Sequence, residues 1–274
     1  MTWEIMLWAG GFLIFCASLV KMRNQGRRIV AQSMVILPYT IIQQQSVGLA
    51  VDSFNSSGMQ IEFTAPQNNL PGTYNNNMFV WTATSDPPVI VPWYTAPTAS
   101  SAMQDGVSAV IVQPSSGTFP AGPYVLGYSV GPSVTASGVT TYPNVCATAM
   151  IPASWDPKQI KYFAPSLGIG GVTTNSIMFQ YALPQGAVPS QNNAWIGFWR
   201  NAMPLYTAGS PIAFIQVNQP DSSGNQGIVF SPGLSPGTMY TAGLFASGFS
   251  KTAGNLVTTA LCASITFQTG QPPG

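Results

Sequence analysis

Tyr124-Val125-Leu126-Gly127 recurs as Tyr240-Thr241-Ala242-Gly243, about 116 residues further along the chain. The same spacing joins Asn76-Asn77-Met78-Phe79-Val80 to Asn192-Asn193-Ala194-Trp195-Ile196, and it joins Cys146-Ala147 to Cys262-Ala263. Residues 59–63 correspond to residues 177–181, at a slightly longer spacing that a two-residue loop insertion explains. The sequence therefore predicts two copies of one module, and a duplicated module usually enlarges a surface or forms an assembly unit.

The chain is nearly free of charge. Charged residues make up 5% of its 274 residues, its net charge is +1, and it contains no histidine. About a quarter of the residues are charged in ordinary soluble domains, whereas here Ser, Thr, Asn, Gln, Gly and Pro take their place. The abundant β-branched and aromatic residues exclude a disordered chain. Neutral polar surfaces pack against copies of themselves without burying unpaired charge, although a thinly charged secreted domain remains the alternative.

Residues 5–20 form an uncharged apolar run, IMLWAGGFLIFCASLV, which predicts an N-terminal hydrophobic helix. The run is slightly short for a membrane span, but interfacial tryptophans and a flanking lysine extend its reach. The residues expected to contact lipid are Ile5, Leu7, Trp8, Phe12, Leu13, Phe15 and Leu19. An acidic residue precedes the run and bases follow it, which is the reverse of a secretory signal, so a retained anchor is favoured over a cleaved segment.

A basic collar follows the apolar run and consists of Lys21, Arg23, Arg27 and Arg28. The positive-inside rule places this collar, and the chain after it, in the cytoplasm, although long domains also cross membranes against the rule. Beyond residue 45 the bases are too few and too scattered to neutralise a phosphate backbone. The sequence therefore predicts association with a lipid membrane and no specific binding of nucleic acid.

Cys146 and Cys262 occupy equivalent places in the two predicted modules, and neither module has a second cysteine. Two buried free thiols are favoured, because free cysteine behaves as a small core residue. A disulfide between the modules is the alternative, and it requires the two strands that carry these residues to meet. The cysteine content does not oppose a reducing compartment.

Short apolar or alternating runs, separated by clusters of Gly, Pro, Asn and Ser, predict about seven strands in each module. In the first module the runs lie at residues 47–54, 59–64, 78–82, 89–93, 107–112, 124–130 and 145–151. In the second module they lie at residues 167–172, 177–181, 195–199, 212–217, 227–230, 239–246 and 262–267. The predicted fold class is all-β, with two similar tandem β-sandwich or jelly-roll modules after the N-terminal helix.

The predicted runs also give the domain boundaries. Residues 1–45 hold the hydrophobic helix, the basic collar and a connecting segment. Residues 46–154 form the first β module, residues 166–270 form the second, and residues 271–274 form a tail. Residues 155–165 form a linker, in which Pro157 fixes the exit direction of the chain.

The segment Leu234-Ser235-Pro236-Gly237-Thr238-Met239-Tyr240 resembles the turn into a late strand of fibronectin type III domains, and Phe119-Pro120-Ala121-Gly122-Pro123-Tyr124 is its counterpart. Residues 51–66 and 172–184 resemble the first two strands of that family. The resemblance implies tandem fibronectin type III or immunoglobulin-like sandwiches, in which the tyrosine hydroxyl bonds back to the preceding loop. A second resemblance is to the tandem jelly rolls of double-barrel viral coat proteins, with room for an eighth strand in residues 92–104 and 205–210.

The sequence predicts no enzyme. Without histidine, the chain lacks the usual general base, the commonest zinc ligand and every Ser–His or Cys–His arrangement. Gly127-Tyr128-Ser129-Val130-Gly131 matches the nucleophile-elbow pattern, but it lies in a predicted strand and no helix follows it. The acidic residues are isolated in sequence, and no glycine loop has phosphate-binding spacing. No catalytic residue, metal ligand or cofactor is therefore assigned.

Aromatic residues are the remaining candidates for binding, and the candidate interface aromatics are Trp93, Tyr94, Trp195 and Trp199. Trp195 and Trp199 point to one face of their strand, whereas Phe198 points to the other. One face fills the core of the sandwich, which leaves the opposite aromatics for sugar stacking or a protein interface. Core filling and packing between the modules is the competing interpretation.

These features favour a non-catalytic structural subunit of a large assembly, specifically a virion coat protein docked on or anchored in a membrane by its N-terminal helix. Its partners would be copies of itself, other assembly proteins and the lipid membrane. An extracellular filament subunit is a close relative of this hypothesis. A membrane-anchored cell-surface adhesin or carbohydrate-binding protein is the alternative. The expected location is membrane-associated, in the virion or at the cell surface.

Overall fold

The computed structural model describes residues 35–136, 138–201 and 205–271, which consist mainly of strands and loops. The described protein is therefore all-β, as the sequence predicts. The expected N-terminal helix, its anchor residues and the basic collar lie outside the described residues. Within the described part of the chain, no helix has both the length and the hydropathy that a membrane span requires.

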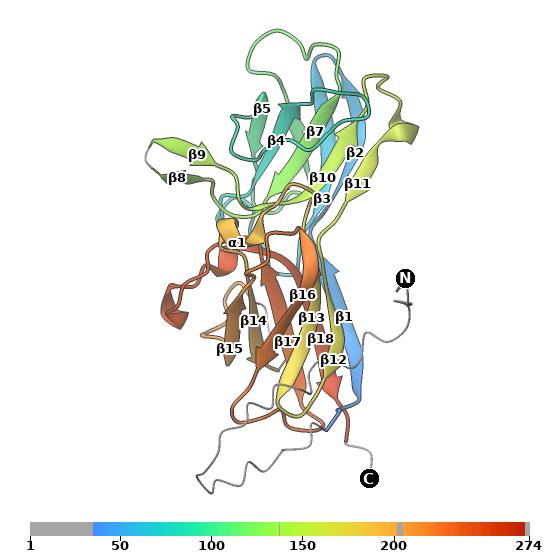
Figure 1. The fold of residues 1–274 in the computed structure, drawn as a ribbon. Helices are drawn as coiled ribbons and strands as arrows, with labels where there is room; N and C mark the ends of the chain where they lie inside the picture. Colours follow the sequence, from blue (N-terminus) through green and yellow to red (C-terminus); the bar gives the residue numbers. More distant parts are fainter. Residues whose placement is uncertain (1–34, 137, 202–204, 272–274) are drawn as a thin grey trace, which may run out of the picture. The chain divides into compact units, whose positions relative to one another are not determined.

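Eight strands form what we call the first sheet pair. Its three-stranded sheet has the order β2-β3-β6, with β2 at Gly48–Asn55, β3 at Gly58–Thr64 and β6 at Ala109–Val112. Its five-stranded sheet has the order β11-β10-β7-β4-β5 (Figure 1), with β11 at Lys161–Phe163, β10 at Val145–Ile151, β7 at Tyr124–Ser129, β4 at Asn77–Thr82 and β5 at Ala99–Ala102. A separate antiparallel hairpin joins β8 (Val134–Ala136) to β9 (Val139–Thr141).

The second sheet pair has the same composition. Its three-stranded sheet has the order β12-β13-β16, with β12 at Ser166–Val172, β13 at Ser176–Ala182 and β16 at Ser223–Val229. Its five-stranded sheet has the order β1-β18-β17-β14-β15, with β1 at Tyr39–Ser46, β18 at Leu261–Thr269, β17 at Met239–Phe245, β14 at Trp195–Arg200 and β15 at Ala213–Gln216. The short helices are α1 (Pro189–Asn192), η1 (Pro157–Gln159), η2 (Ala253–Asn255) and η3 (Thr258–Ala260).

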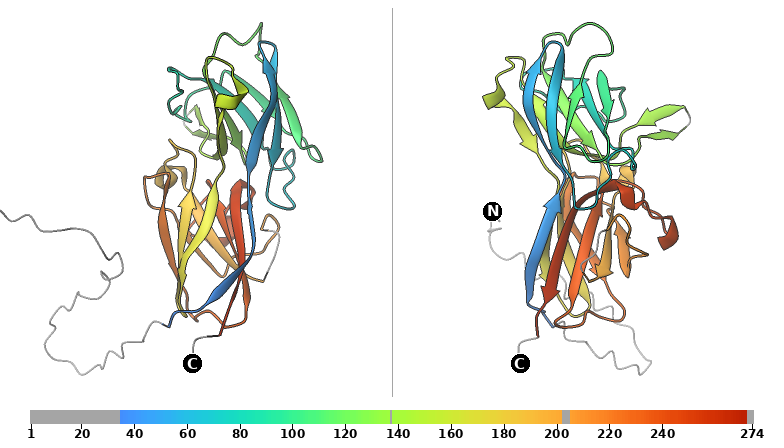
Figure 2. Two further views of the ribbon diagram at one scale, coloured as in Figure 1. Left: turned by 90° about the vertical axis from the view of Figure 1, so that its right-hand side faces the viewer. Right: turned by 180° about the vertical axis from the view of Figure 1, so that it is seen from behind.

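The chain passes from one sheet pair to the other at two points. β1 pairs with β18 of the second sheet pair, and after Val47 the chain continues as β2 of the first (Figure 2). Val47 is fully buried, and its N–H donates to the carbonyl of Cys262 at 2.9 Å. β11 pairs with β10 and then leads into β12. Residues 39–45, predicted from the sequence to be part of a connecting segment, belong instead to an edge strand, which is mostly exposed and therefore has no apolar alternation.

The three-stranded sheets bury one face each, as antiparallel sheets on a core do. Buried and exposed residues alternate along β3 and along β13. The buried residues are Met59, Ile61 and Phe63 in β3, and Ile177, Phe179 and Tyr181 in β13. They belong to the main hydrophobic core, so the alternation predicted from the sequence is confirmed for these strands.

The five-stranded sheets are buried on both faces. Phe198 of β14 belongs to the main core, whereas Trp195 and Trp199 belong to a separate cluster with Leu205, Tyr206, Phe245 and Leu261. Trp195 is completely buried, and Trp199 is 2% exposed. The prediction that these two tryptophans form an interface on an open face is therefore wrong. The side chains of Leu205, Tyr206, Ala208, Phe249 and Leu256 pack over that face.

The first sheet pair has a corresponding outer cluster. It contains Phe79 and Trp81 of β4 together with Val91, Trp93 and Tyr142. Residues 89–93, predicted as a strand, form no strand, because this segment packs Val91 and Trp93 against the outer face of the sheet. An apolar run that covers a sheet and one that belongs to a sheet look alike in sequence.

The glycine of each repeated Tyr-x-x-Gly segment lies under a large side chain of the outer cluster. A β-carbon on Gly127 would lie 3.0 Å from the Trp81 ring and 2.9 Å from Val145. A β-carbon on Gly243 would lie 2.6 Å from Leu205. Glycine in a strand often marks such a close approach. The repeated glycines therefore preserve packing on the outer faces.

The two tyrosines of the repeat hold the loops that precede their strands. The Tyr124 hydroxyl donates to the carbonyl of Pro120 at 2.5 Å, and the Tyr240 hydroxyl accepts from the N–H of Ser235 at 2.9 Å. These are the bonds that the resemblance to fibronectin type III domains implies. The jelly-roll resemblance receives no support from the sheets. Residues 99–102 of the proposed eighth-strand segment 92–104 do form β5, but the described residues of 205–210 form no strand.

Candidate binding cleft

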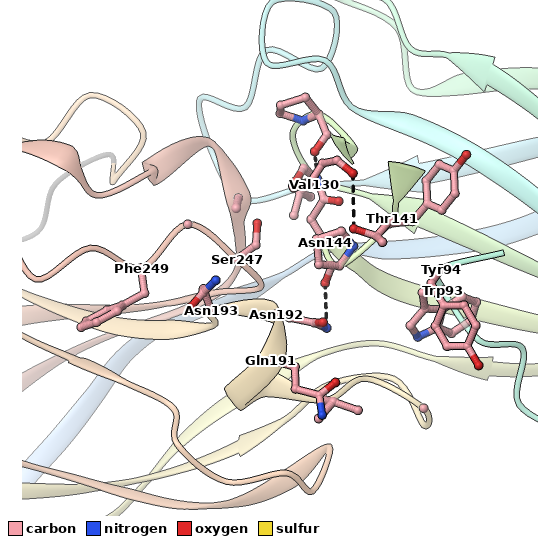
Figure 3. Close-up of a pocket in the computed structure, with 18 of the residues that line it drawn as sticks. Trp93, Tyr94, Val130, Thr141, Asn144, Gln191, Asn192, Asn193, Ser247 and Phe249 are labelled. Carbon is pink, nitrogen blue, oxygen red and sulfur yellow. Dashed lines mark hydrogen bonds between the residues drawn. The ribbon is translucent and has the colours of Figure 1, made fainter. Parts of the chain in front are cut away.

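A cleft of about 700 Å³ is lined by loops from both sheet pairs. Pockets for small molecules usually have volumes of this order. The first sheet pair contributes residues from 90–94 and 130–144, and the second contributes residues from 186–193, 247–249 and 257–260. Figure 3 shows the amide side chains of Asn144, Gln191 and Asn192 between the rings of Trp93 and Tyr94 and the ring of Phe249.

Trp93 and Tyr94 form the aromatic side of the cleft. Trp93 is 6% exposed because its ring packs on Trp81 in the outer cluster, with centroids 5.0 Å apart. The carbonyl of Trp93 also accepts from the N–H of Tyr142 at 2.9 Å, which fixes the loop. The next residue, Tyr94, is 65% exposed. A fixed loop thus presents a free phenol ring at the cleft.

Asn144 shapes the middle of the cleft. Its side chain is buried, and its Nδ2 lies 2.6 Å from the carbonyls of Val130 and Gly131 and 2.9 Å from that of Pro132. The amide therefore holds the chain that leaves β7. Its Oδ1 is buried and, among the described residues, has no hydrogen-bond partner.

The turn around α1 supplies amides from the second sheet pair. Pro189 begins the helix, as proline often does, and Asn193 ends it in the left-handed region at φ 56°. Asn192 Nδ2 donates to the carbonyl of Pro143 in the first sheet pair at 3.2 Å. The N–H of Phe249 donates to the carbonyl of Asn193 at 2.9 Å. These bonds fix the turn, while Gln191 and Asn193 stay exposed.

The cleft has no charge. None of the described residues that line it is Asp, Glu, Lys or Arg. Its polar groups are amides and hydroxyls, and its apolar groups are aromatic rings, prolines and valines. An uncharged site of this kind favours uncharged ligands, because an ionised ligand would lose water without gaining a counter-charge.

The structure brings together two of the four candidate interface aromatics. Trp93 and Tyr94 lie in the cleft, whereas Trp195 and Trp199 do not. The amides of Asn144, Gln191, Asn192 and Asn193 also line the cleft and are not among the candidates predicted from the sequence. Asn192-Asn193 does appear in the repeat, but the repeat alone does not distinguish a landmark of the fold from a binding residue.

The nucleophile-elbow match has a structural role. Ser129 lies within β7 and is fully buried, and its Oγ donates to the carbonyl of Gly131 at 3.4 Å. Within the described residues, no group of three His, Cys, Asp or Glu side chains is placed to hold a metal ion. The expectation of a chain without catalytic activity or cofactor stays a prediction.

Cys146 and Cys262 are both buried and free, as the sequence analysis favours. Burial raises the pKa of each thiol well above its ordinary value, and proximity to Cys262 raises the pKa of Cys146 further. The Sγ atoms donate to the carbonyls of Tyr128 at 3.4 Å and Leu244 at 3.1 Å. Both thiols are therefore neutral core groups.

Comparison with known proteins assigns no family. No protein-family model matches the sequence, and no curated protein matches it. Among solved structures, the chain is similar to the central fibronectin-III array of RIM-binding protein, with 14% identity and a TM-score of 0.24. The match covers 73% of this chain and 57% of that chain, so the protein spans less than two thirds of that structure. A similarity of this size assigns neither ligand nor activity.

Proposed function

We propose that the protein is a non-catalytic structural subunit that assembles with copies of itself through the edges of its sheets. The supporting observation is the chemistry of the edge strands. A free edge exposes unpaired N–H and C=O groups, and proteins commonly protect it with charged residues, proline or bulges. Of the eight strands at the edges of the two sheet pairs, β2 and β11 carry a charged residue and β1 and β12 carry a bulge. The other four, β5, β6, β15 and β16, have no charged residue, no proline and no bulge.

The third strand of each three-stranded sheet is the best candidate for such pairing. β6 (Ala-Val-Ile-Val) and β16 (Ser-Gly-Asn-Gln-Gly-Ile-Val) pair with their neighbours without a bulge. Ile111 of β6 is 59% exposed, and Val229 of β16 is 80% exposed. The N–H of Phe63 donates to the carbonyl of Ser108 at 2.8 Å. Because bonding alternates along an antiparallel pair, the peptide groups of Ile111 point away from β3.

Two equivalent edges in one chain favour an extended assembly. A single self-complementary edge closes a two-fold dimer, whereas two edges let each copy contact two neighbours. A duplicated module would thus give each copy of the chain the two contact edges that a coat or a filament requires. The low charge of the chain fits the same role, because copies approach without repulsion.

Sedimentation velocity of the full chain in a mild detergent tests the proposal. We expect oligomers larger than a dimer for the unaltered chain. Ile111→Lys and Val229→Lys should each reduce the number of copies in the oligomer, because a charged side chain on an edge strand opposes pairing of that strand. If β6 of one copy pairs with β16 of the next, either substitution removes every contact and leaves monomers. If β6 pairs with β6 and β16 with β16, each single variant keeps one pairing edge and forms dimers. The double variant should be monomeric.

Leu70→Lys is the matched control, because Leu70 is also an exposed aliphatic residue, at 44%, but lies in a loop outside the sheets. It should leave the oligomers unchanged. A monomeric unaltered chain at the highest soluble concentration would refute assembly. Equal loss of oligomers in the Leu70 variant would refute the role of the edges.

The narrower form of this proposal is a virion coat protein docked on a membrane. It rests on the sequence of residues 5–28, where an apolar run precedes a basic collar. Flotation of the full chain with neutral and with anionic lipid vesicles tests the membrane part. Removal of residues 1–34 should abolish flotation, and flotation that survives the removal would contradict the anchor.

A further inference from the structure

The uncharged cleft holds two buried polar atoms that the described residues leave without a partner. One is Nε1 of Trp93, a donor, and the other is Oδ1 of Asn144, an acceptor. Trp93 is 6% exposed and Asn144 is 1% exposed. Buried polar groups in proteins are nearly always hydrogen-bonded. Both atoms lie beneath the surface of the cleft, so a ligand would contact the exposed side chains around them.

Hydroxyl groups suit the exposed amides of the cleft, because a hydroxyl both donates and accepts, as an amide side chain does. The amides of Gln191 and Asn193 extend the polar surface, since both side chains are exposed at the α1 turn. Ser247 adds a hydroxyl from the loop after β17. The lining thus matches a ligand that carries several neutral polar groups along its length.

The aromatic side of the cleft matches the other surface of such a ligand. Tyr94 is 65% exposed and follows the fixed residue Trp93, so its ring offers a free face. Phe249 provides a second ring, held by the bond between its N–H and the carbonyl of Asn193. The C–H face of a pyranose ring stacks on aromatic rings, and its hydroxyls bond to amides at its edge.

From these contacts we infer that the cleft binds a neutral carbohydrate, with Tyr94 as the stacking platform and Gln191 as a donor and acceptor at the rim. Acidic sugars, phosphorylated headgroups and acidic peptides are disfavoured, because the lining has no basic residue to pair with an anion. The inference does not depend on assembly through the sheet edges. Ile111→Lys, which is outside the cleft, should therefore leave carbohydrate binding intact.

An array of neutral, sialylated and sulphated glycans, probed with the full chain, is the first test. We expect retention on neutral glycans and none on their sialylated or sulphated forms. The neutral glycan that is retained most strongly is then titrated calorimetrically in solution. The inference would be overturned if the chain were retained on no neutral glycan or on charged glycans alone. It would also be overturned if the chain bound proline-rich peptides on a parallel peptide array and bound no glycan.

Substitutions locate the site. Tyr94→Ala should weaken binding of the titrated glycan by about twofold to twelvefold, which is the range that an aromatic contact contributes. Gln191→Ala should weaken it by a smaller factor. Tyr162→Ala is the matched control, because Tyr162 is 50% exposed on β11 and does not line this cleft. Equal affinity of the Tyr94 variant and the unaltered chain, or equal weakening by Tyr162→Ala, would place the carbohydrate elsewhere.

Discussion

Trp195 stacks on Phe245 with ring centroids 3.9 Å apart and ring planes 8° apart. This contact lies on the face of the sheet opposite Phe198, so β14 separates two apolar clusters. The same arrangement recurs around Trp81 of β4. The five-stranded sheets are therefore central layers, each packed against a three-stranded sheet on one face and against loops on the other.

Trp195→Ala should destabilise the protein as a core substitution does. We expect the free energy of unfolding to fall by about 3–5 kcal/mol, the usual cost of truncating a buried tryptophan. Tyr94→Ala, at an exposed position, should change it by less than about 0.5 kcal/mol. Urea unfolding followed by circular dichroism measures both. A loss below about 1 kcal/mol for the Trp195 variant would show that the outer cluster is not a second core.

The Tyr240 hydroxyl holds the loop that contains Ser235 through one hydrogen bond, and its ring packs within the main core. Tyr240→Phe removes the hydroxyl and keeps the ring, so we expect a loss of about 1 kcal/mol, the net contribution of one hydrogen bond. Tyr124→Phe should cost a similar amount, since its hydroxyl donates to Pro120. Urea unfolding of Tyr94→Phe, which should match the unaltered chain, is the control. If neither Tyr240→Phe nor Tyr124→Phe lowers the free energy of unfolding measurably, these hydrogen bonds do not stabilise the loops.

The sequence predicts the inner strands well, because their residues alternate or are continuously apolar. Runs such as 59–64 and 177–181 correspond to β3 and β13 within one residue at each end. β1 is missed because a mostly exposed edge strand has no core pattern, and residues 89–93 are misassigned because a covering loop is as apolar as a strand. Only Trp93 and Tyr94 of the cleft are foreseen. Asn144 and Gln191 meet there through folding, and local patterns do not encode contacts between distant loops.

Gly243→Ala should destabilise the protein through overpacking. Its β-carbon would lie 2.6 Å from Leu205 and 2.9 Å from Leu261, two buried residues of the outer cluster. Overpacking of this kind typically costs about 1–3 kcal/mol. Gly171→Ala in β12 is the control, because a β-carbon there meets nothing within 4 Å. If thermal unfolding gives the two variants the same midpoint, the proposed close approach over Gly243 is wrong.

Burial of Cys146 and Cys262 should make the stability depend on pH above neutrality. Burial raises the pKa of both thiols in the folded protein, whereas an exposed thiol in the unfolded chain has a pKa of about 8.5. Below that pH both states keep the proton, and the stabilising effect of the neutral thiols is complete. As the pH rises past it, only the unfolded chain loses protons, so the free energy of unfolding falls.

The expected slope approaches about 1.4 kcal/mol per pH unit for each thiol above pH 8.5. Urea unfolding between pH 7.5 and about 9.5 measures it, a range that ends below the ordinary pKa of tyrosine. The double variant Cys146→Ala/Cys262→Ala is expected to be less stable at neutral pH but to show a flatter profile. Parallel profiles for the variant and the unaltered chain would mean that the thiols ionise equally in both states, which is incompatible with their burial.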